Sequence, residues 1–153
     1  HRQHNLDIRV ARIFNTYGPR MHPNDGRVIS NFIVQALNDE DITIYGDGNQ
    51  TRSFCFVDDL IKGFLSFMEA DKKITGPINL GNPDEIKIFD LARTIINLTN
   101  SKSIITNSPL PEDDPMRRRP NIDLASESIN WNPNIDLITG LKKTIDYFKK
   151  EII

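Results

Sequence analysis

The chain has 153 residues, enough for one domain with a buried core or for part of a larger protein. Its 19 basic and 21 acidic residues nearly cancel, so the composition predicts neither nucleic acid nor a membrane surface as a partner. Cys55 is the single cysteine, and no apolar run reaches membrane-spanning length, so no disulfide framework, thiolate metal cluster or transmembrane segment is expected. No targeting segment is visible, and a cytoplasmic location is expected.

The first part of the chain is predicted to place a strand before a helix. Residues 1–5 are polar, like the end of a helix, and residues 8–14 form a β-prone run suited to a strand inside a sheet. Residues 21–27 are rich in turn formers. From residue 28 to residue 37, apolar side chains recur at helical spacing, which predicts one amphipathic helix.

Two further strands and a second helix are expected next. The strands cover residues 42–45 and 52–56, and the glycines of the intervening segment 46–49 supply the positive φ that a tight reversal needs. A helical stripe then covers residues 57–68. Two aspartates near its start favour the helix dipole and are interpreted as helix-start residues, not as an acid/base pair.

The second half continues the alternation of strands and helices, which argues for the α/β class. Strands are expected at residues 78–80 and 104–106, and helices at 88–96 and 138–148. Residues 109–121 contain four of the nine prolines and a triple arginine, so a loop is predicted there.

Motifs of several enzyme classes are missing from the sequence. It contains no Gly-rich strand-to-helix fingerprint, no serine nucleophile elbow and no HExxH motif. Its three histidines, His1, His4 and His22, are not arranged as metal ligands, so no metal site is predicted. Local patterns alone therefore predict no complete active site.

Arginines placed in loops beside apolar elements are the main chemical signal. They are Arg20, Arg27, Arg52, Arg117, Arg118 and Arg119. A guanidinium group donates two parallel hydrogen bonds to phosphate, and Arg27 precedes a helix N-terminus, where an anion is favoured. Two interpretations stay open at this level. The arginines form a phosphate-binding set, or they are solvated and the acidic segment 112–114 neutralises the triple arginine.

Three other residues receive structural interpretations from their local context. Tyr45 is interpreted as a core residue and not as a base-stacking group. His22 is interpreted as a surface loop residue and not as a catalyst. Cys55 lies between two phenylalanines and is interpreted as a buried, inert thiol.

Four segments together resemble the extended short-chain dehydrogenase/reductase family. They are ARIFNTYGPRMHPNDGRVISNFIVQAL, ITIYGDGNQTRSFCFVDDL, INLGNPDE and DDPMRRRPNIDLA, in the family's order. The likeness covers essentially the whole chain and is greatest for the UDP-glucuronate decarboxylases (UDP-xylose synthases). It implies a Rossmann-type α/β fold of which this chain is the C-terminal part. The family's Gly-rich NAD-binding turn and catalytic Tyr-x-x-x-Lys are not in the sequence.

The resemblance also implies a division of the chain. Residues 1–20 would hold a late Rossmann strand and a cleft loop. Residues 21–153 would form mainly the substrate-binding lobe, with the helix at 57–70 returning toward the Rossmann part. The whole protein is expected to be a homodimer.

Roles for individual residues follow from the same resemblance. Positions similar to NAD-binding residues are Thr16, His22 and Arg27. Positions similar to residues that bind the sugar nucleotide are Asn15, Val28, Asn31, Thr43, Tyr45, Arg52 and Arg118. Among these, Arg52 resembles the arginine on the diphosphate. Arg118 resembles an arginine with an assigned acid role in related decarboxylases, which makes it the one catalytic candidate in the chain.

The activity implied is NAD-dependent conversion of UDP-glucuronate to UDP-xylose. A hydride passes from C4 of the sugar to NAD, the 4-keto acid loses CO2, and the hydride returns. The 153 residues alone are expected to be inactive. Two alternatives remain at this stage: a sugar-nucleotide 4,6-dehydratase or 4-epimerase of the same family, and a non-catalytic module that binds nucleotide sugars.

Overall fold

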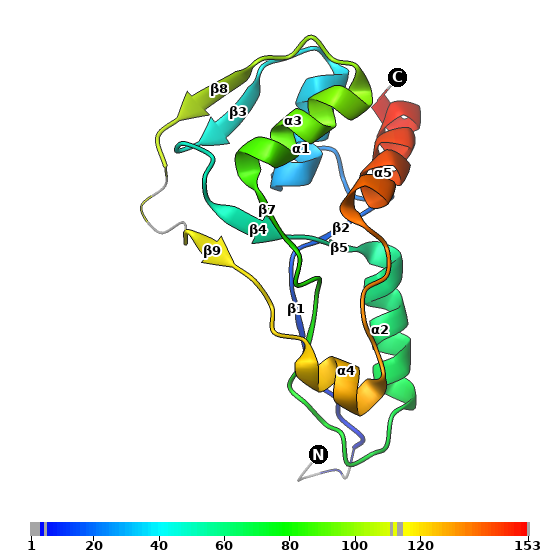
Figure 1. The fold of residues 1–153 in the computed structure, drawn as a ribbon. Coiled ribbons are helices and arrows are strands. Elements are labelled where there is room, and N and C mark those ends of the chain that lie inside the picture. Colours follow the sequence, from blue (N-terminus) through cyan, green and yellow to red (C-terminus); the bar gives the residue numbers. More distant parts are fainter. Residues whose placement is uncertain (1–3, 5, 111, 113–114, 153) are drawn as a thin grey trace.

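A computed structural model describes residues 4, 6–110, 112 and 115–152 (Figure 1). The polar segment at 1–5, apart from His4, lies outside the described residues, and so do Asp113 and Asp114. Within the described part, no helix combines the length and apolar character needed to cross a membrane.

The described residues alternate strands and helices, and the predicted α/β class is confirmed. The helices are α1 (Val28–Leu37), α2 (Val57–Glu69), α3 (Ile88–Thr99), α4 (Asp123–Ile129) and α5 (Leu137–Ile152). The strands are β1 (Ala11–Ile13), β2 (Thr16–Tyr17), β3 (Ile42–Tyr45), β4 (Thr51–Ser53), β5 (Cys55–Phe56), β6 (Ile78–Leu80), β7 (Glu85–Lys87), β8 (Ile105–Ser108) and β9 (Arg117–Arg118).

Most strand pairs are parallel, as expected when helices connect the strands. β1 pairs with β6, β2 with β5, and β3 with β8, each in parallel. In the three-stranded sheet, β4 lies in the middle, antiparallel to β7 and parallel to β9. Figure 1 shows β3 and β8 side by side at one end of the molecule, and α2 and α4 toward the other.

The segment 42–56 follows the prediction in part. Gly46 and Gly48 have φ of 73° and 74°, as predicted. The strands on either side of them join different sheets, since β3 pairs with β8 while β4 pairs with β7 and β9. The predicted strand 52–56 is divided at Phe54, because the N–H of Cys55 turns to the carbonyl of Asn15 at 2.8 Å and begins the pairing with β2.

The predicted loop 109–121 contains a strand that the sequence analysis did not anticipate. Arg117 and Arg118 form β9, in register with Thr51 and Arg52 of β4. The N–H of Thr51 also donates to the carbonyl of Met116 at 2.9 Å. The pure loop interpretation of this segment is therefore wrong, because the backbone groups of β4 provide partners that local sequence rules cannot see.

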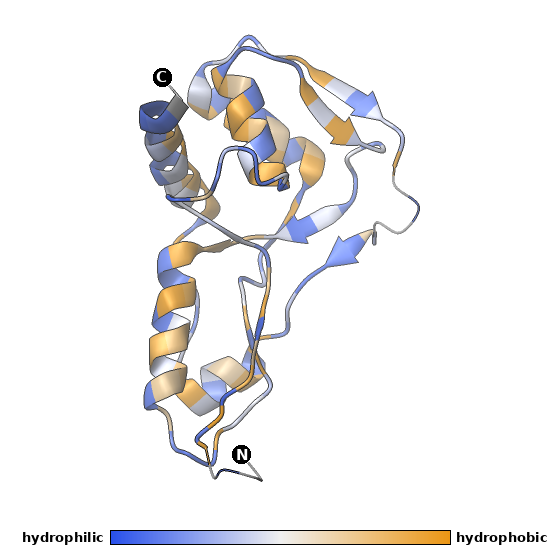
Figure 2. Ribbon diagram, turned by 180° about the vertical axis from the view of Figure 1, so that it is seen from behind, coloured by the Kyte–Doolittle hydropathy of each residue, from blue (hydrophilic) through white to orange (hydrophobic). Residues whose placement is uncertain are grey.

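Two groups of buried side chains hold the fold together. The α1/α3/α5 cluster joins these three helices to β3 and the aromatic residues of β2 and β5; it includes Ile29, Phe32, Ile33, Ile42, Ile44, Leu91, Ile95, Leu141, Ile145 and Phe148. The α2/α4 cluster joins α2 and α4 to β6; it consists of Cys55, Leu60, Phe67, Ile78, Leu80, Ile122, Ala125, Ile129 and Trp131. Figure 2 shows apolar residues along the helices of both clusters.

Candidate functional site

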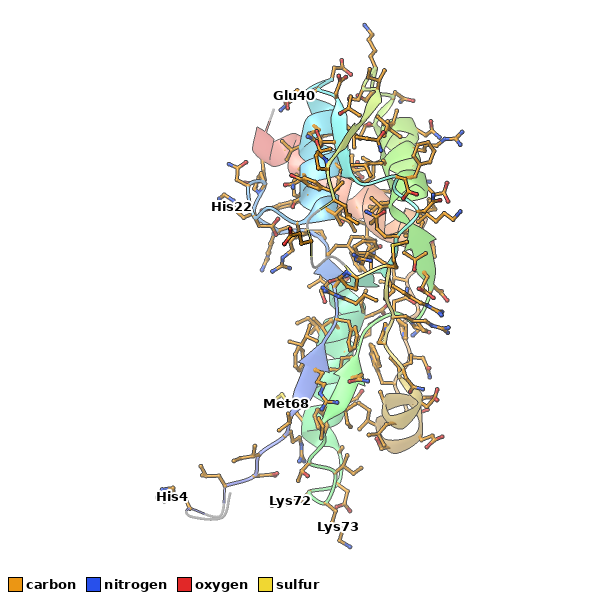
Figure 3. The ribbon with its side chains drawn as sticks, turned by 90° about the vertical axis from the view of Figure 1, so that its left-hand side faces the viewer. His4, His22, Glu40, Met68, Lys72 and Lys73 are labelled. Atoms are coloured by element: carbon orange, nitrogen blue, oxygen red, sulfur yellow. The ribbon has the colours of Figure 1, made fainter. Side chains whose placement is uncertain are left out.

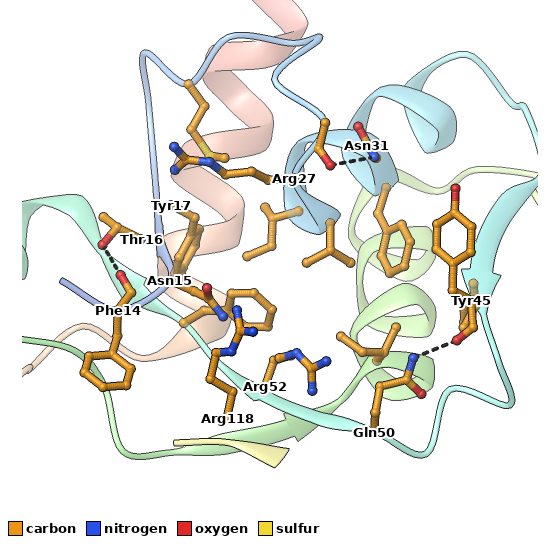
Figure 4. A pocket seen from close by; sticks show the side chains of 18 of the residues that line it. Phe14, Asn15, Thr16, Tyr17, Arg27, Asn31, Tyr45, Gln50, Arg52 and Arg118 are labelled. Carbon is orange, nitrogen blue, oxygen red and sulfur yellow. Dashed lines mark hydrogen bonds between the residues drawn. The ribbon is translucent and has the colours of Figure 1, made fainter. Parts of the chain in front are cut away.

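A cavity of about 640 Å³ opens beside the N-terminus of α1. Its wall is formed by the residues that follow β1, by the start of α1, and by strands β3, β4 and β9 (Figure 4). In open α/β sheets, ligands bind just beyond the carboxyl ends of the strands. The residues that follow β1 occupy such a position.

The cavity gathers nearly all the positions that the sequence analysis singled out. Those that line it are Asn15, Thr16, Arg27, Val28, Asn31, Thr43, Tyr45, Arg52 and Arg118. His22 is not among the lining residues. It is exposed on the loop before α1, where its Nδ1 accepts a hydrogen bond from the N–H of Asn24 at 3.1 Å (Figure 3).

Positive charge dominates the cavity wall. Three arginines, Arg27, Arg52 and Arg118, line it, and no aspartate or glutamate is among the described lining residues. Arg52 and Arg118 are direct partners on the parallel strands β4 and β9, so their side chains lie on the same face of the sheet. Three guanidinium groups gathered in one cavity wall favour an anionic ligand.

The structure separates the six loop arginines into two groups. Arg20, Arg117 and Arg119 are not among the residues that line the cavity. Arg117 pairs with Glu85, which lies on β7, so the partner that the sequence analysis sought in the acidic segment 112–114 is supplied by another strand. Strand alternation explains the division of the triple arginine, because neighbouring residues of β9 point to opposite faces.

The N-terminus of α1 forms one side of the cavity. Arg27 is its N-cap residue, with extended backbone geometry and without a side-chain capping bond of its own. Asp25 braces this start of the helix, because its Oδ1 accepts the N–H of Arg27 at 3.0 Å and the hydroxyl of Ser30, and its Oδ2 lies 3.5 Å from Nε of Arg27. Asn31 is turned back by a bond from its Nδ2 to the carbonyl of Gly26 at 3.2 Å (Figure 4).

The turn that follows β1 is fixed by its own hydrogen bonds. The carbonyl of Asn15 accepts the N–H of Cys55 at 2.8 Å, which holds the backbone while the side chain lines the cavity. The hydroxyl of Thr16 donates to the carbonyl of Phe14 at 2.9 Å (Figure 4). The oxygen of Thr16 keeps its lone pairs, so this hydroxyl can accept a hydrogen bond from a ligand.

Tyr45 corrects one prediction made from local sequence. Its side chain is 53% exposed at the edge of the cavity, so the core interpretation is wrong. The position ends β3, and side chains alternate along that strand, with Ile42 and Ile44 buried. An exposed aromatic ring at a cavity edge presents a face on which a planar group can stack.

Gln50 lines the cavity but was not singled out from the sequence. It is 5% exposed, and its Nε2 donates to the carbonyl of Tyr45 at 2.7 Å (Figure 4). This bond closes the glycine turn between β3 and β4. The sequence offered one signal for Gln50, namely an amide side chain placed directly before the strand that carries Arg52.

Tyr17 lines the cavity but has a structural role. It is 1% exposed, and its hydroxyl donates to the carbonyl of Leu137 at 3.2 Å, at the start of α5. Burial, reinforced by the charge of Asp136, raises the pKa of Tyr17 well above its usual range. A phenol held protonated in this way anchors a helix and does not act as a base near neutral pH.

Cys55 agrees with the sequence interpretation. It is fully buried, and burial raises the pKa of its thiol to about 12. Because the thiolate is the reactive form, the thiol is inert in the folded chain. The described residues also contain no group of three or more His, Cys, Asp or Glu side chains arranged to hold a metal ion.

With this geometry established, comparison with known proteins identifies the family. Residues 1–81 match the profile of the NAD dependent epimerase/dehydratase family. The chain belongs to this family. It is 50% identical over 151 residues to UDP-glucuronic acid decarboxylase 1 of Danio rerio, which covers 99% of this chain and 36% of the relative. UDP-glucuronic acid decarboxylase 2 of Arabidopsis thaliana is 46% identical over 99% of this chain and 34% of its own length. The chain thus spans about a third of these curated relatives.

Solved structures of the same family share the fold. An epimerase from Methanothermobacter thermautotrophicus superposes with a TM-score of 0.93 at 30% identity, over 99% of this chain and 46% of that protein. The UDP-glucuronic acid 4-epimerase of Bacillus cereus, solved with UDP-glucuronic acid and NAD, gives a TM-score of 0.89 at 30% identity, over 99% and 48% of the two chains. The Rossmann-type family assignment made from sequence is therefore confirmed.

Proposed function

We propose that this chain is the C-terminal, substrate-binding part of an NAD-dependent UDP-glucuronate decarboxylase that makes UDP-xylose. Relatives with 46–50% identity carry the name UDP-glucuronic acid decarboxylase. The division of the chain into residues 1–20, a late Rossmann strand and cleft loop, and residues 21–153, mainly the substrate lobe, is part of this proposal.

The charge of the cavity is the observation that carries the proposal. The cavity brings three arginines, Arg27, Arg52 and Arg118, together in its described wall. A nucleotide sugar presents a diphosphate with charged oxygens, which guanidinium groups bind through paired hydrogen bonds. Each such charge-assisted bond contributes about 1.5–3 kcal/mol, so two arginines hold the diphosphate firmly.

The remaining lining residues fit the other parts of such a ligand. Tyr45, which Figure 4 shows across the cavity from Asn15, and Thr43 on the same strand would contact the nucleobase, and Asn15 would contact the sugar. Val28 and Asn31, on the first turn of α1, would follow the sugar nucleotide along the cavity.

The NAD contacts would lie beside the turn after β1. The donor set fits the cofactor, because Thr16 offers a hydroxyl oxygen and Arg27 a guanidinium at a helix N-terminus, where a pyrophosphate is favoured. His22 lies outside the cavity wall and would reach only the part of NAD that extends beyond it. When bound, NAD supplies the acceptance and return of a hydride at the sugar.

The residues of this chain would act mainly by orientation. Arg52 and Arg118 hold the diphosphate, which fixes the attached sugar relative to the end of β1. Orientation of this kind supplies a large share of a barrier reduction, up to about 7–11 kcal/mol in well-aligned systems. Arg118 would also place its charged guanidinium group beside the sugar, and we propose that Arg118 acts as an acid from this position.

A second candidate comes from the structural neighbours. The solved structures with TM-scores of 0.89–0.93 include epimerases, and one of them was solved in complex with UDP-glucuronic acid and NAD. The decarboxylases are 46–50% identical to this chain and the epimerases 30%. The higher identity supports decarboxylation. Incubation of the whole protein with UDP-glucuronate and NAD separates the two, because UDP-xylose supports the first and UDP-galacturonate the second.

Calorimetric titration of the chain with UDP tests the binding part of the proposal. We expect binding, and an Arg52→Ala affinity lower by at least about tenfold, which corresponds to about 1.4 kcal/mol. Arg12→Ala is the matched control, since Arg12 is exposed on β1 and outside the cavity wall. Absence of binding at millimolar UDP, or equal losses in both variants, would contradict the proposal.

Assembly and location remain predictions. A homodimeric whole protein is proposed from the family resemblance, and a cytoplasmic location is proposed separately from it. Sedimentation of the whole protein tests the first, and cell fractionation tests the second. The 153 residues alone are proposed to be catalytically inactive, which CO2 release from the isolated chain with NAD and UDP-glucuronate would contradict.

A further inference from the structure

One carboxylate connects all three strands of the β7–β4–β9 sheet. Glu85 on β7 accepts the hydroxyl of Thr51 on β4 through Oε1 at 2.7 Å. It also accepts Nε of Arg117 on β9 at 2.9 Å to each oxygen, and Nη2 of Arg117 at 2.5 Å through Oε2. The side chain of Glu85 is 17% exposed, and that of Arg117 is 63% exposed. The carboxylate of Glu85 therefore joins the central strand β4 to the edge strand β9.

These three side chains and the cavity lie on opposite faces of the sheet. Side chains alternate along a strand, so Arg117 and Arg118 point to opposite sides. Arg118 lines the cavity together with its register partner Arg52, whereas Arg117 contacts Glu85. The contact with Glu85 on the outer face and the guanidinium group in the cavity therefore belong to neighbouring residues of the same strand.

Within the described part of the chain, the other hydrogen bonds that hold β9 in place are few, and they include the N–H of Thr51 donating to the carbonyl of Met116 at 2.9 Å. The strand has two residues, and prolines stand two positions before it and two after it. Its backbone pairs with β4 in parallel, and the carbonyl of Arg118 also accepts the hydroxyl of Ser53 at 3.3 Å. A parallel pairing of this length is weak. The bidentate, charge-assisted contact with Glu85 is the strongest geometry among the described contacts of β9.

We propose that Glu85 is a positioning residue, which holds strand β9 through Arg117 so that Arg118 projects into the cavity. This inference rests on the proposed function, because it assumes that Arg118 contacts the diphosphate of a nucleotide sugar. Arg117 then serves as the attachment of the strand, not as a ligand contact. In the simple alternative, Glu85 and Arg117 form an exposed ion pair that contributes little to stability or to ligand binding.

UDP titration of the chain carrying Glu85→Gln tests the inference. Glutamine preserves the shape of the side chain and an acceptor for Thr51, but it removes the charge and one acceptor for Arg117. We expect UDP affinity to fall by about threefold to tenfold, the range that follows when a partly exposed bidentate pair holds one contact residue. Glu127→Gln is the control, because Glu127 is an exposed carboxylate on α4. It should leave the affinity unchanged.

A double-mutant cycle distinguishes positioning from a general structural effect. If Glu85 acts through Arg118, Glu85→Gln has no further effect on UDP affinity in a chain that already carries Arg118→Ala. If it acts elsewhere, the two losses multiply. Reversal of the pair, Glu85→Arg together with Arg117→Glu, should restore most of the affinity that either single change removes.

Hydrogen exchange gives a readout that needs no ligand. We expect faster amide exchange in residues 116–119 of Glu85→Gln than in the unchanged chain, with exchange in α3 unaltered. Unchanged exchange in 116–119 overturns the inference, and so does equal UDP affinity of the two chains. Failure of the unchanged chain to bind UDP contradicts the proposed function instead, and the exchange measurement then decides whether Glu85 holds β9.

Discussion

The two buried clusters of this chain use their helices differently. In the α1/α3/α5 cluster, three helices turn their apolar faces toward one another and toward β3. In the α2/α4 cluster, α2 buries Leu60 and Phe67 but leaves Ile61, Leu65 and Met68 at 51%, 53% and 69% exposure. Figure 3 labels Met68 at the surface of this region.

The difference shows that a helix with a broad apolar stripe can bury only part of that stripe. The apolar residues of α2 could meet neighbours on two sides of the helix, but among the described residues only one side is covered. Val10, just before β1, and Ile13 on β1 are also 49% and 57% exposed. The α2/α4 cluster therefore rests on fewer enclosing elements, and we expect it to be the less stable of the two.

Truncation of a buried aliphatic residue in each cluster tests this comparison. Ile78→Ala in β6 and Leu91→Ala in α3 each remove a side chain with 0% exposure, and each should lower the free energy of unfolding by about 2–5 kcal/mol. Trp131 is the single tryptophan, is 4% exposed and belongs to the α2/α4 cluster, so its fluorescence reports that cluster. We expect Ile78→Ala to lower the urea midpoint of this fluorescence more than the midpoint of helical circular dichroism.

Leu91→Ala is the matched substitution, and the opposite pattern is expected for it. Leu124→Ala serves as the control, because Leu124 is 52% exposed on α4 and its removal should change neither midpoint appreciably. If both buried variants shift both probes by the same amount, the clusters unfold as one unit and the comparison fails.

A glycine in α5 tests how tightly the α1/α3/α5 cluster is closed. A Cβ at Gly140 would lie 2.1 Å from the hydroxyl oxygen of Tyr17 and 2.8 Å from Cδ2 of Phe56. Gly140→Ala must therefore displace α5 or the buried tyrosine, and we expect a loss of about 1–3 kcal/mol in stability despite the better helix propensity of alanine. Urea unfolding followed by circular dichroism measures it.

The control for this change lies two residues away. Lys142 is exposed on the same helix, so Lys142→Ala should leave the stability within about 0.5 kcal/mol of the unchanged chain. A stable Gly140→Ala variant with an intact bond from Tyr17 to Leu137 would show that the packing here is looser than the structure indicates.

Sequence patterns predicted the long elements because those elements carry their own periodic signal. Helices α1, α2, α3 and α5 appear where apolar residues recur at helical spacing. Helix α4 was missed, because its seven residues give too few turns for a period, and tertiary contacts of Ala125 and Ile129 with α2 and β6 stabilise it. β9 was missed because its strand character depends on distant partners on β4.

The candidate site was predictable through family resemblance more than through local rules. Residue types showed that arginines were available, but not which of them face a common cavity. Which arginines face the cavity depends on the alternation of side chains along β9, which directs Arg118 into the cavity and Arg117 toward Glu85. Tyr45 was misjudged for a related reason, since its exposure follows from its place at the end of β3 and not from its aromatic character.

The smallest expected effect concerns a carboxylate that links the end of α1 to the segment after α3. Asp39, just after α1, accepts the N–H of Lys102 at 2.8 Å and the hydroxyl of Ser101 at 2.9 Å. The bond from the Lys102 backbone and then that from Ser101 lower the pKa of Asp39. Because the folded pKa lies below the unfolded value, the carboxylate stabilises the fold above the unfolded pKa, and this contribution is lost as the pH falls through the folded pKa.

Asp39→Asn removes this contribution while keeping the backbone. Asp39 has φ of 54°, a conformation that asparagine also tolerates, so the change affects charge more than geometry. We expect a slightly lower melting temperature near neutral pH and a shallower decline of the melting temperature as the pH falls below the ordinary aspartate pKa of about 3.9, because the pKa of Asp39 lies below that value in the folded chain. Thermal melts by circular dichroism measure both. Asp146→Asn removes an exposed carboxylate from α5 of the same cluster as a control. A pH dependence equally steep in Asp39→Asn and in the unchanged chain would mean that the contact with Lys102 adds no stability to the cluster.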